Sequence, residues 1–355
     1  MRFRTFFSPL LWLGLTFFFN EFFIYELNVR ASCGWIGDDD EVSQRFFMIS
    51  DTHLLGIYKG HWFDKLRREW QMWRSYRSAV NYFRPKTVFF LGDLMDEGQW
   101  TDDALFAQYA SRFEELFGPR DEEEMKVYVL PGNHDLGFHY VLDPQRVTWF
   151  ADRFRTRPVE TLILGGQPFV LVTSMALEGD GCRLCAEAEM ELARLGRLLK
   201  CAKNSSCHDR EAAQFRPYQP PILLQHFPLF RLNDSVCARD DDFDWSDPTR
   251  DEKFRPGWDC LTSAATDKLV EWLEPRAAFA GHTHRGCKRR FETRFGTFNE
   301  WTVNSFSWRN GPKPSFLMVT VSAGQVNVST CHLPNENFVK TPSNSVAIFK
   351  QSFHA

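Results

Sequence analysis

The segment RFFMISDTH, residues 45–53, decides the fold class. Its compact apolar run at 45–50 predicts a buried strand, and Asp51 and His53 follow directly at the carboxyl end. Four later apolar runs end in the same way. They are 87–91 before Gly92-Asp93, 126–130 before Gly132-Asn133-His134-Asp135, 222–224 before His226, and 277–280 before Gly281-His282-Thr283-His284. The repeated pattern predicts strands that deliver polar side chains at their ends.

Helical periodicity separates these strands. Apolar residues recur at spacings of three, four and seven across 61–83, which predicts an amphipathic helix. The remaining predicted elements are helices at 102–117, 184–200 and 263–273, and strands at 169–172, 302–307, 316–321 and 325–331. Because helices alternate with strands, we predict an α/β fold with at least one largely parallel sheet.

The polar residues at the strand ends are expected to converge on one site. In open α/β sheets, ligands collect beyond the carboxyl ends of the strands, and the flanking glycines permit tight turns there. A lone His is more often structural, and a lone Asp often caps a helix. Five of the ten His nevertheless occur in these motifs, so separate structural roles explain them poorly. The candidate ligands are Asp51, His53, Asp93, Asn133, His226, His282 and His284.

The donor types select the metal. Two Asp, one Asn and four His offer oxygen and imidazole donors without thiolates, which suits Mn, Fe or Zn at two adjacent positions. In an extended segment, Asp-x-His and His-x-His place both side chains on one side. Asp93 is the natural bridging carboxylate between two ions roughly 3.5–4 Å apart. The sequence therefore predicts a site for two divalent metal ions.

The N-terminus predicts a membrane anchor. Residues 6–19 carry no charge and the apolar run resumes at 22–25, about 20 residues that match roughly 30 Å of hydrocarbon. The alternative, a cleaved signal peptide, needs a small-x-small site that 22–27 lack. With Arg2 and Arg4 on the cytosolic side, we expect this organisation: a cytosolic segment 1–5, a transmembrane signal anchor 6–27, a linker 28–44, a lumenal catalytic domain 45–335 and a polar tail 336–355.

Cysteine usage fits a lumenal domain. All nine Cys follow the predicted anchor, on the side where disulfides form, and an odd number leaves at least one thiol free or paired between molecules. Cys182, Cys185, Cys201 and Cys207 match a four-thiolate zinc site, but a disulfide-stapled loop is the preferred interpretation. Glycosylation sequons at Asn204, Asn233 and Asn327 lie on the same side. The net charge of −4 argues against a nucleic-acid partner.

The ordered motifs resemble the calcineurin-like metallophosphoesterase superfamily over about residues 45–310. The resemblance implies a four-layer α/β/β/α sandwich and a centre of two Mn²⁺ ions. It also implies that Asp51, His53 and His284 bind one ion, that Asn133, His226 and His282 bind the other, and that Asp93 bridges them. His134 would be the acid that protonates the leaving oxygen, held by Asp135, which would raise the His134 pKa.

Four segments carry a closer resemblance within that superfamily: 51–56, 60–72, 179–182 and 305–310. They are similar to secretory-pathway members that remove an ethanolamine-phosphate side branch from a mannose of GPI anchors. This implies a phosphodiesterase of GPI-glycan remodelling that supports ER-to-Golgi transport. Its partners would be the GPI glycan and the membrane, and its location the ER exit sites, the ER–Golgi intermediate compartment and the Golgi.

Two alternatives remain at this point. The same chemistry would serve another lumenal phosphoester, such as a phospholipid, a nucleotide or a phosphoprotein. A scaffold that has lost catalysis would lack ligands or the acid, and none is missing here. Residues 340–355 contain neither the second membrane span nor the sorting signal of the similar members, so trafficking is expected to differ from theirs.

Overall fold

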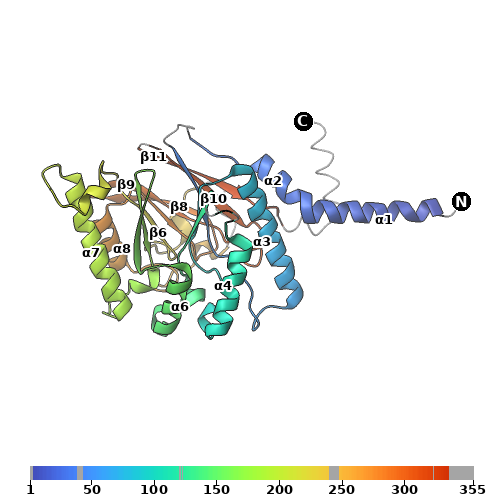
Figure 1. Cartoon of the computed structure of the whole chain (residues 1–355), viewed down its shortest axis with the longest axis horizontal. Helices are drawn as coiled ribbons and strands as arrows, with labels where there is room; N and C mark the ends of the chain where they lie inside the picture. Colours follow the sequence, from blue (N-terminus) through green and yellow to red (C-terminus); the bar gives the residue numbers. More distant parts are fainter. Residues whose placement is uncertain are drawn as a thin grey trace.

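The computed structural model of the protein describes residues 3–37, 43–119, 121, 123–239, 248–322 and 324–335. The predicted polar tail 336–355 lies outside the described residues. Figure 1 shows a main body of sheets and helices from which the N-terminal helix α1 (Phe3–Phe18) projects.

Two mixed sheets form the centre of the body. The first has the order β11-β10-β1-β2-β3, with β1, β2 and β3 parallel; its strands are β1 (Gln44–Ile49), β2 (Thr87–Phe90), β3 (Lys126–Val129), β10 (Ser315–Ser322) and β11 (Gln325–His332). The second has the order β4-β5-β6-β7-β9-β8, with β5, β6, β7 and β9 parallel; its strands are β4 (Val159–Leu164), β5 (Gln167–Val172), β6 (Ile222–Gln225), β7 (Ala277–Ala280), β8 (Cys287–Thr293) and β9 (Gly296–Thr302).

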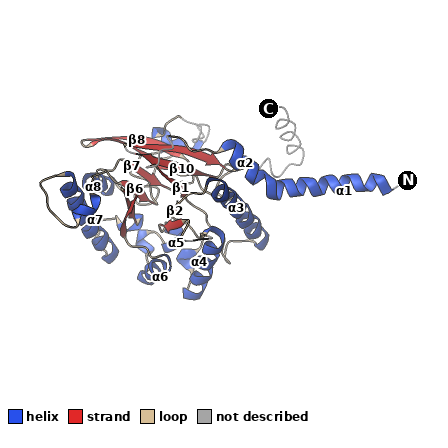
Figure 2. Ribbon diagram, turned by 45° about the horizontal axis from the view of Figure 1, so that its top comes forward, coloured by secondary structure: helices blue, strands red, loops and turns tan. Residues whose placement is uncertain are grey.

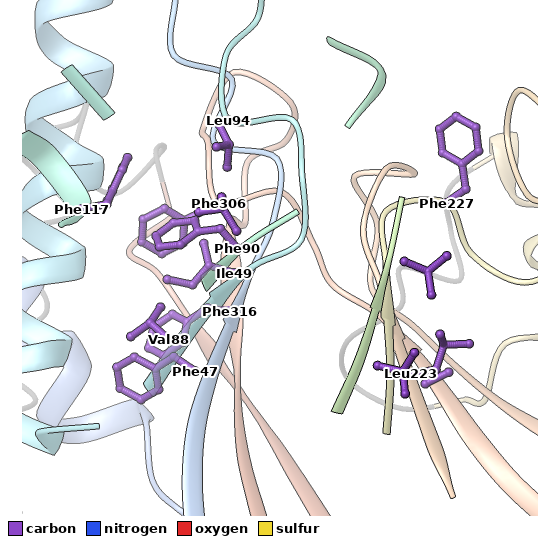
Figure 3. Packing of buried hydrophobic residues seen from close by; sticks show 14 of the residues in the cluster. Phe47, Ile49, Val88, Phe90, Leu94, Phe117, Leu223, Phe227, Phe306 and Phe316 are labelled. Atoms are coloured by element: carbon purple, nitrogen blue, oxygen red, sulfur yellow. The ribbon is translucent and has the colours of Figure 1, made fainter. Parts of the chain in front are cut away.

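Alternating side chains of each strand separate two apolar layers. Phe46 points into the core between the sheets, where its ring lies 5.0 Å from that of Phe169 in β5. Phe47 points the other way and joins the core beneath the helices (Figure 3). Since both faces are covered, β1 and β2 read as continuous apolar runs rather than as alternating ones.

Helices cover the outer faces and complete the predicted α/β class (Figure 2). The longer ones are α3 (Trp62–Phe83), α4 (Asp103–Phe117), α6 (Pro144–Phe154), α7 (Arg183–Lys203) and α8 (Ser263–Leu273). Helices α3 and α4 contribute to the core against β1 and β2, whereas α7 and α8 pack beside the second sheet. The resulting order of helix, sheet, sheet, helix agrees with the predicted four layers.

Most predicted elements are present, with differences at the sheet edges. The predicted strand 302–307 is wrong beyond Thr302, where β9 ends. The chain turns there because the Phe306 amide donates to the Ser50 carbonyl at 2.9 Å and the Ser305 hydroxyl to the Asp51 carbonyl at 2.7 Å. Strands β4, β8 and β9 and helix α6 were not predicted. In β8 the alternating pattern CKRRFET places charged side chains on an exposed face, which weakens the apolar signal.

The N-terminal segment differs from the predicted boundaries. A π-helical turn (Phe19–Phe23) and helix α2 (Ile24–Ser32) follow α1 without a break. Helix α2 packs on the domain, since Tyr25 and Val29 are buried and the Trp70 indole of α3 donates to the Glu21 carbonyl at 3.2 Å. The end of the expected span and the start of the expected linker are therefore part of the folded body. Within the described chain, no single helix meets the length and apolarity that a membrane crossing requires.

The cysteines form four disulfides, Cys33–Cys331, Cys182–Cys185, Cys201–Cys207 and Cys237–Cys287. Cys260 is a buried free thiol, which confirms the prediction that an odd cysteine remains. The zinc alternative for the four cysteines between 182 and 207 is wrong, because they pair at opposite ends of α7.

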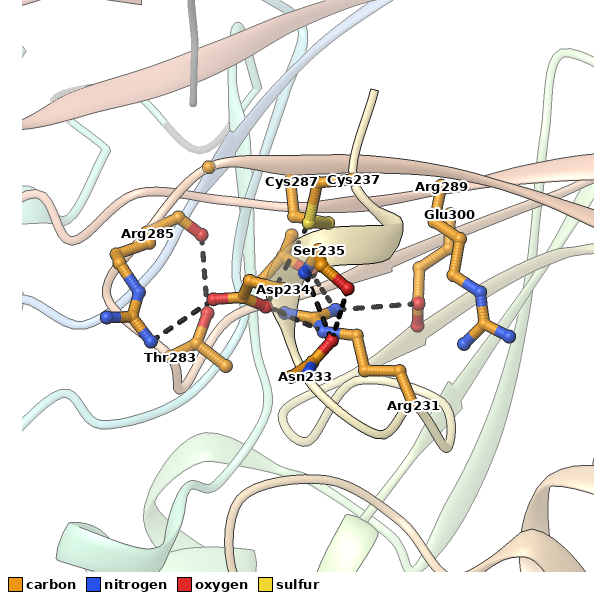
Figure 4. The surroundings of a disulfide bond; sticks show 12 residues. Arg231, Asn233, Asp234, Ser235, Cys237, Thr283, Arg285, Cys287, Arg289 and Glu300 are labelled. Carbon is orange, nitrogen blue, oxygen red and sulfur yellow. Dashed lines mark hydrogen bonds and ion pairs between the residues drawn. A yellow bond between two sulfur atoms is a disulfide. The ribbon is translucent and has the colours of Figure 1, made fainter. Parts of the chain in front are cut away.

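A buried ion-pair network braces the second sheet beside the Cys237–Cys287 disulfide (Figure 4). The Arg231 guanidinium lies 2.9 Å from the Asp234 carboxylate, and neither side chain is exposed. Arg231 also donates to the Thr302 hydroxyl at 3.0 Å, while Arg285 pairs with Asp234 at 3.1 Å. The network therefore ties the loop after β6 to β9 and to the loop that precedes β8.

Removing the Arg231 guanidinium takes a counter-charge away from two buried carboxylates, Asp234 and Glu300, although Arg285 still pairs with Asp234. We expect Arg231→Ala to lower the free energy of unfolding by about 3–5 kcal/mol. The matched control is Arg294→Ala, which breaks an ion pair with Glu271 that is 68% and 55% exposed and should cost at most about 1 kcal/mol. Urea denaturation of both variants measures the difference, and similar losses would contradict a buried-charge role for Arg231.

Candidate metal centre

Five parallel strands from the two sheets bring the predicted ligands together. In the first sheet, Asp51 and His53 follow β1, Asp93 follows β2, and Asn133 opens the short helix α5 (Asn133–Leu136) after β3. In the second sheet, His226 follows β6, and His282 and His284 follow β7. The expected convergence is therefore present, but it joins the strand ends of two sheets rather than of one.

The backbone is strained where it presents the ligands. Left-handed φ angles occur at Asp51 (57°), His53 (44°), Asp93 (52°), His282 (72°) and His284 (61°). The other described non-glycine residues with positive φ, at 84, 155 and 274, each cap the end of a helix. Such conformations cost of order 1–3 kcal/mol each and persist mainly at functional sites. The strain marks these five positions as selected for chemistry rather than for stability.

Two glycines allow the loops to approach each other. A Cβ atom on Gly132 would collide with the Asp93 carboxylate, and one on Gly281 would collide with the Ser50 side chain. The contact of Gly281 with Ser50 joins the two sheets. Gly281 follows β7 of the second sheet, and Ser50 follows β1 of the first. A side chain at Gly281 would push the two sheets apart at the site, and one at Gly132 would displace the Asp93 carboxylate.

The first group of donors consists of Asp51, His53, Asp93 and His284, whose ligand atoms all lie within 4.8 Å of one another. His53 Nε2 lies 3.5 Å from Asp93 Oδ2 and 3.7 Å from Asp51 Oδ1. His284 Nε2 lies 3.5 Å from Asp51 Oδ1. All but His284 are buried, so these polar atoms face one another rather than water.

The second group consists of Asp93, His226 and His282, again within 4.8 Å. His226 Nε2 lies 3.3 Å from Asp93 Oδ2 and 3.1 Å from Asn133 Oδ1. Asp93 thus belongs to both groups through the same carboxylate oxygen. That position suits a bridging ligand between two cations.

In three of the imidazoles, one ring nitrogen contacts an oxygen atom that orients the ring. His53 Nδ1 lies 3.2 Å from Asp96 Oδ1, His226 Nδ1 lies 2.7 Å from the Leu91 carbonyl, and His282 Nε2 lies 2.5 Å from the Trp258 carbonyl. In His53 and His226 the other nitrogen, Nε2, faces the Asp93 carboxylate. His282 Nδ1 is buried with no hydrogen-bond partner among the described residues. Rings oriented in this way are typical of metal ligands, so the residues present fit two divalent cations.

Without a bound cation, protons would balance the charge of the buried carboxylates. Burial alone would lower the pKa of His53, but hydrogen bonds with Asp51 and Asp96 outweigh it and raise the pKa to about 10. Burial acts in the same direction on His226, and the Asp93 carboxylate raises its pKa to about 9. Without a cation, both imidazoles would therefore carry protons at neutral pH, and a cation would displace these protons on binding.

The predicted contact between Asp135 and His134 is wrong. His134 Nδ1 instead lies 2.9 Å from the Asp96 carbonyl and 3.6 Å from its carboxylate. The buried Asp135 carboxylate accepts the amides of Gly132 (2.8 Å) and Met95 (3.0 Å). Successive residues of a helix do not face each other, which explains why the two neighbouring side chains diverge. Asp135 therefore fixes the loop backbone around Asp93.

The sequence interpretation missed Asp96 as a site residue. Its carboxylate contacts His53 and accepts a hydrogen bond from the Arg309 guanidinium at 2.7 Å. Burial would raise the pKa of Asp96, but hydrogen bonds from His53 and Arg309 hold it well below the usual range. The sequence did contain a signal for Asp96, because it lies three residues after Asp93 in the motif that follows β2. It contained none for the pairing with Arg309, which is 213 positions away in the chain.

The comparisons with known proteins agree with this geometry. The family model described as calcineurin-like phosphoesterase matches residues 44–286. A metallophosphoesterase 1 homolog from Caenorhabditis elegans is 42% identical over 92% of this chain and 85% of its own length. Metallophosphoesterase 1 of Mus musculus is 40% identical, covering 93% and 84%, and that of Danio rerio is 38% identical, covering 91% and 84%.

Metal binding at neutral pH should release the protons held by His53 and His226. With pKa values of about 10 and 9, we expect about two protons per protein at pH 7 when Mn²⁺ saturates the site. The number should fall as pH rises through 9, because the free imidazoles then lose their protons unaided. Calorimetric titration in buffers of different ionisation enthalpy measures the release. His226→Ala is the matched variant and should release about one proton fewer; no release from the wild type would contradict the assignment.

Proposed function

The chain belongs to the calcineurin-like phosphoesterase family and is a metal-dependent phosphoester hydrolase; from this premise, we propose that it cleaves a phosphodiester in the glycan of GPI anchors. The reaction would remove an ethanolamine-phosphate branch from mannose during glycan remodelling. The observation that carries the catalytic part is Asp93, one buried carboxylate shared by two groups of metal donors. The similarity to metallophosphoesterase 1 across most of both chains supports the substrate.

We assign the metals by donor group. Asp51, His53 and His284 would hold one cation, and Asn133, His226 and His282 the other, with Asp93 shared. Oxygen and imidazole donors without thiolates suit Mn²⁺. When bound, the cations supply polarisation of the phosphoester and activation of water. The ligand loops, with their left-handed backbone angles, hold the donor atoms of each group within 4.8 Å of one another.

His134 is positioned to act as the proton donor. Its Nδ1 is held at the Asp96 carbonyl, so Nε2 is the nitrogen left for the leaving oxygen. The side chain is 26% exposed, and its ring centre lies 4.7 Å from that of His53. The donor therefore sits between the metal ligands and solvent. Arg309 supports the arrangement by pairing with the Asp96 carboxylate.

The surroundings of the site support a membrane-bound, lumenal substrate. Four disulfides are typical of a secretory compartment. The helix α1 projects from the body (Figure 1). It exposes large apolar side chains, among them Leu11, Trp12, Leu13 and Phe17. We propose that it anchors the domain to the membrane of the early secretory pathway, from ER exit sites to the Golgi. The GPI glycan, rather than nucleic acid, is then the partner.

The role of His134 predicts a dependence on the leaving group. We expect His134→Ala to lower kcat about 10²–10⁴-fold for an alkyl phosphodiester, whose leaving oxygen needs a proton. The loss should be much smaller for a p-nitrophenyl ester, since that leaving group departs as a stable anion. His208→Ala, at an exposed histidine, is the matched control and should change neither rate. Equal losses for both esters in the His134 variant would exclude the acid role.

The substrate proposal is tested in cells that lack this protein. Mass spectrometry of their GPI glycans should find ethanolamine phosphate retained on mannose, and expression of the wild type should remove it. Asp93→Ala, which lacks the shared carboxylate, should fail to rescue. If no branch is retained, the GPI substrate is excluded. Purified protein assayed with Mn²⁺ against phospholipid, nucleotide and phosphoprotein esters then identifies the substrate of the same centre.

A further inference from the structure

Two disulfides of short sequence separation cap the opposite ends of helix α7 (Arg183–Lys203). Cys182–Cys185 closes a three-residue separation at the N-terminus, and Cys201–Cys207 closes a six-residue separation at the C-terminus. Neither pair belongs to the proposed metal centre. Since the same helix carries both, they form a natural comparison between the two ends of one helix dipole.

Cys182 occupies the N-cap of this helix. Its sulfur accepts a hydrogen bond from the Cys185 amide at 3.0 Å, the contact that a capping side chain makes with the free amides of a first turn. Cys182 is partly exposed, whereas Cys185 is buried. An incoming thiol therefore reaches Cys182 first. Once reduced, the Cys182 thiolate would keep the same amide donor and the favourable end of the dipole.

A histidine faces the inner sulfur. His139 Nδ1 lies 3.8 Å from Cys185 Sγ and 2.9 Å from the Met175 carbonyl, and Nε2 lies 2.8 Å from the Asp180 carboxylate. Burial lowers the pKa of His139, but the bonds to Asp180 and Met175 outweigh it and raise the pKa. The ring is thus a proton source beside the sulfur that leaves when Cys182 is attacked.

We propose that Cys182–Cys185 is a thiol–disulfide exchange site that accepts two electrons from a dithiol. A thiolate of the dithiol attacks Cys182 Sγ, the bond between Cys182 and Cys185 breaks, and Cys185 Sγ takes the electron pair and a proton from His139. The second thiol of the reductant then attacks the reductant's first sulfur, which is bonded to Cys182 Sγ in the mixed disulfide. This bond breaks and releases Cys182 as a thiolate. The reductant becomes a disulfide, and its remaining protons pass to His139 and solvent.

Other charges around the pair act on it as well. Asp180 and Glu178 are the carboxylates near His139, and they oppose formation of a thiolate. On the α8 side, Lys268 is paired with Glu189 of α7 at 2.5 Å, so its charge is largely balanced. The dipole and the capping amide therefore provide the main stabilisation of a Cys182 thiolate.

Cys201–Cys207 has the opposite environment. It lies where the helix presents carbonyl groups, and the Asn204 amide donates to the Cys201 carbonyl at 3.0 Å. Lys200, Lys203 and Arg216 lie nearby and offset part of the negative end of the dipole, Arg216 through the Cys201 and Cys207 carbonyls. These cations act on carbonyl groups and not on a capped sulfur. The pair at the C-terminus is therefore the more resistant one.

A redox titration of the full-length protein tests this difference without any substitution. The protein is equilibrated at a series of ratios of reduced to oxidised dithiothreitol, quenched with an alkylating reagent and mapped by mass spectrometry. We expect Cys182–Cys185 to be half-reduced at a ratio at least about tenfold lower than Cys201–Cys207. Reduction of both pairs at the same ratio, or of Cys201–Cys207 first, would overturn the proposal.

Two sets of variants separate chemistry from structure. In Cys185→Ser, the remaining Cys182 should alkylate with an apparent pKa below the usual value of about 8.5, whereas the thiol left in Cys207→Ser should not. His139→Ala and His139→Gln should both slow reduction of Cys182–Cys185 severalfold and leave Cys201–Cys207 unchanged. Rescue by the Gln variant, which keeps a hydrogen bond but holds no proton, would reduce His139 to a structural role and overturn the proton transfer.

Discussion

Three carboxylates buried in one place are the constraint on which this molecule depends. Asp51, Asp93 and Asp135 are at most 1% exposed, and each unpaired buried charge costs several kcal/mol. The fold neutralises Asp51 and Asp93 with the imidazoles of His53 and His226, whose pKa values rise as a result. Burial and the Asp93 charge raise the pKa of Asp135 to about 7. A site so rich in negative charge is stable only with protons or cations, and cations are what a phosphoester hydrolase needs.

Neither sheet provides the site alone. The His226 ring, from β6 of the second sheet, contacts the Leu91 carbonyl after β2 of the first at 2.7 Å. The Gly281 backbone, after β7, lies against Ser50, after β1. Because donors from both sheets are required, any change in how the sheets pack would separate the donor groups. The apolar layer between the sheets, including the contact of Phe46 with Phe169, therefore supports the geometry of the metal centre.

The errors of sequence interpretation share one cause. The expected partner of His134 was its neighbour Asp135, but a residue from another strand end, Asp96, holds the ring. The first residues of the expected linker, 28–32, belong instead to helix α2, because Val29 is buried against the domain. Local patterns describe what a segment prefers by itself. They do not describe which distant segment it meets, and that contact decided each of these cases.

The sequence by itself determined the strands that lead into the site, most of the longer helices and the seven candidate metal donors, because strand ends and donor types are local properties of the chain. The order of the two sheets, the ring nitrogen that faces each donor group, and the pairing of Arg309 with Asp96 were decided by tertiary structure alone. The physical reason is the distance along the chain over which each interaction acts. Hydrophobic periodicity acts over a few residues, whereas Asp96 and Arg309, at a sequence separation of 213, meet only when both sheets and their helices have packed.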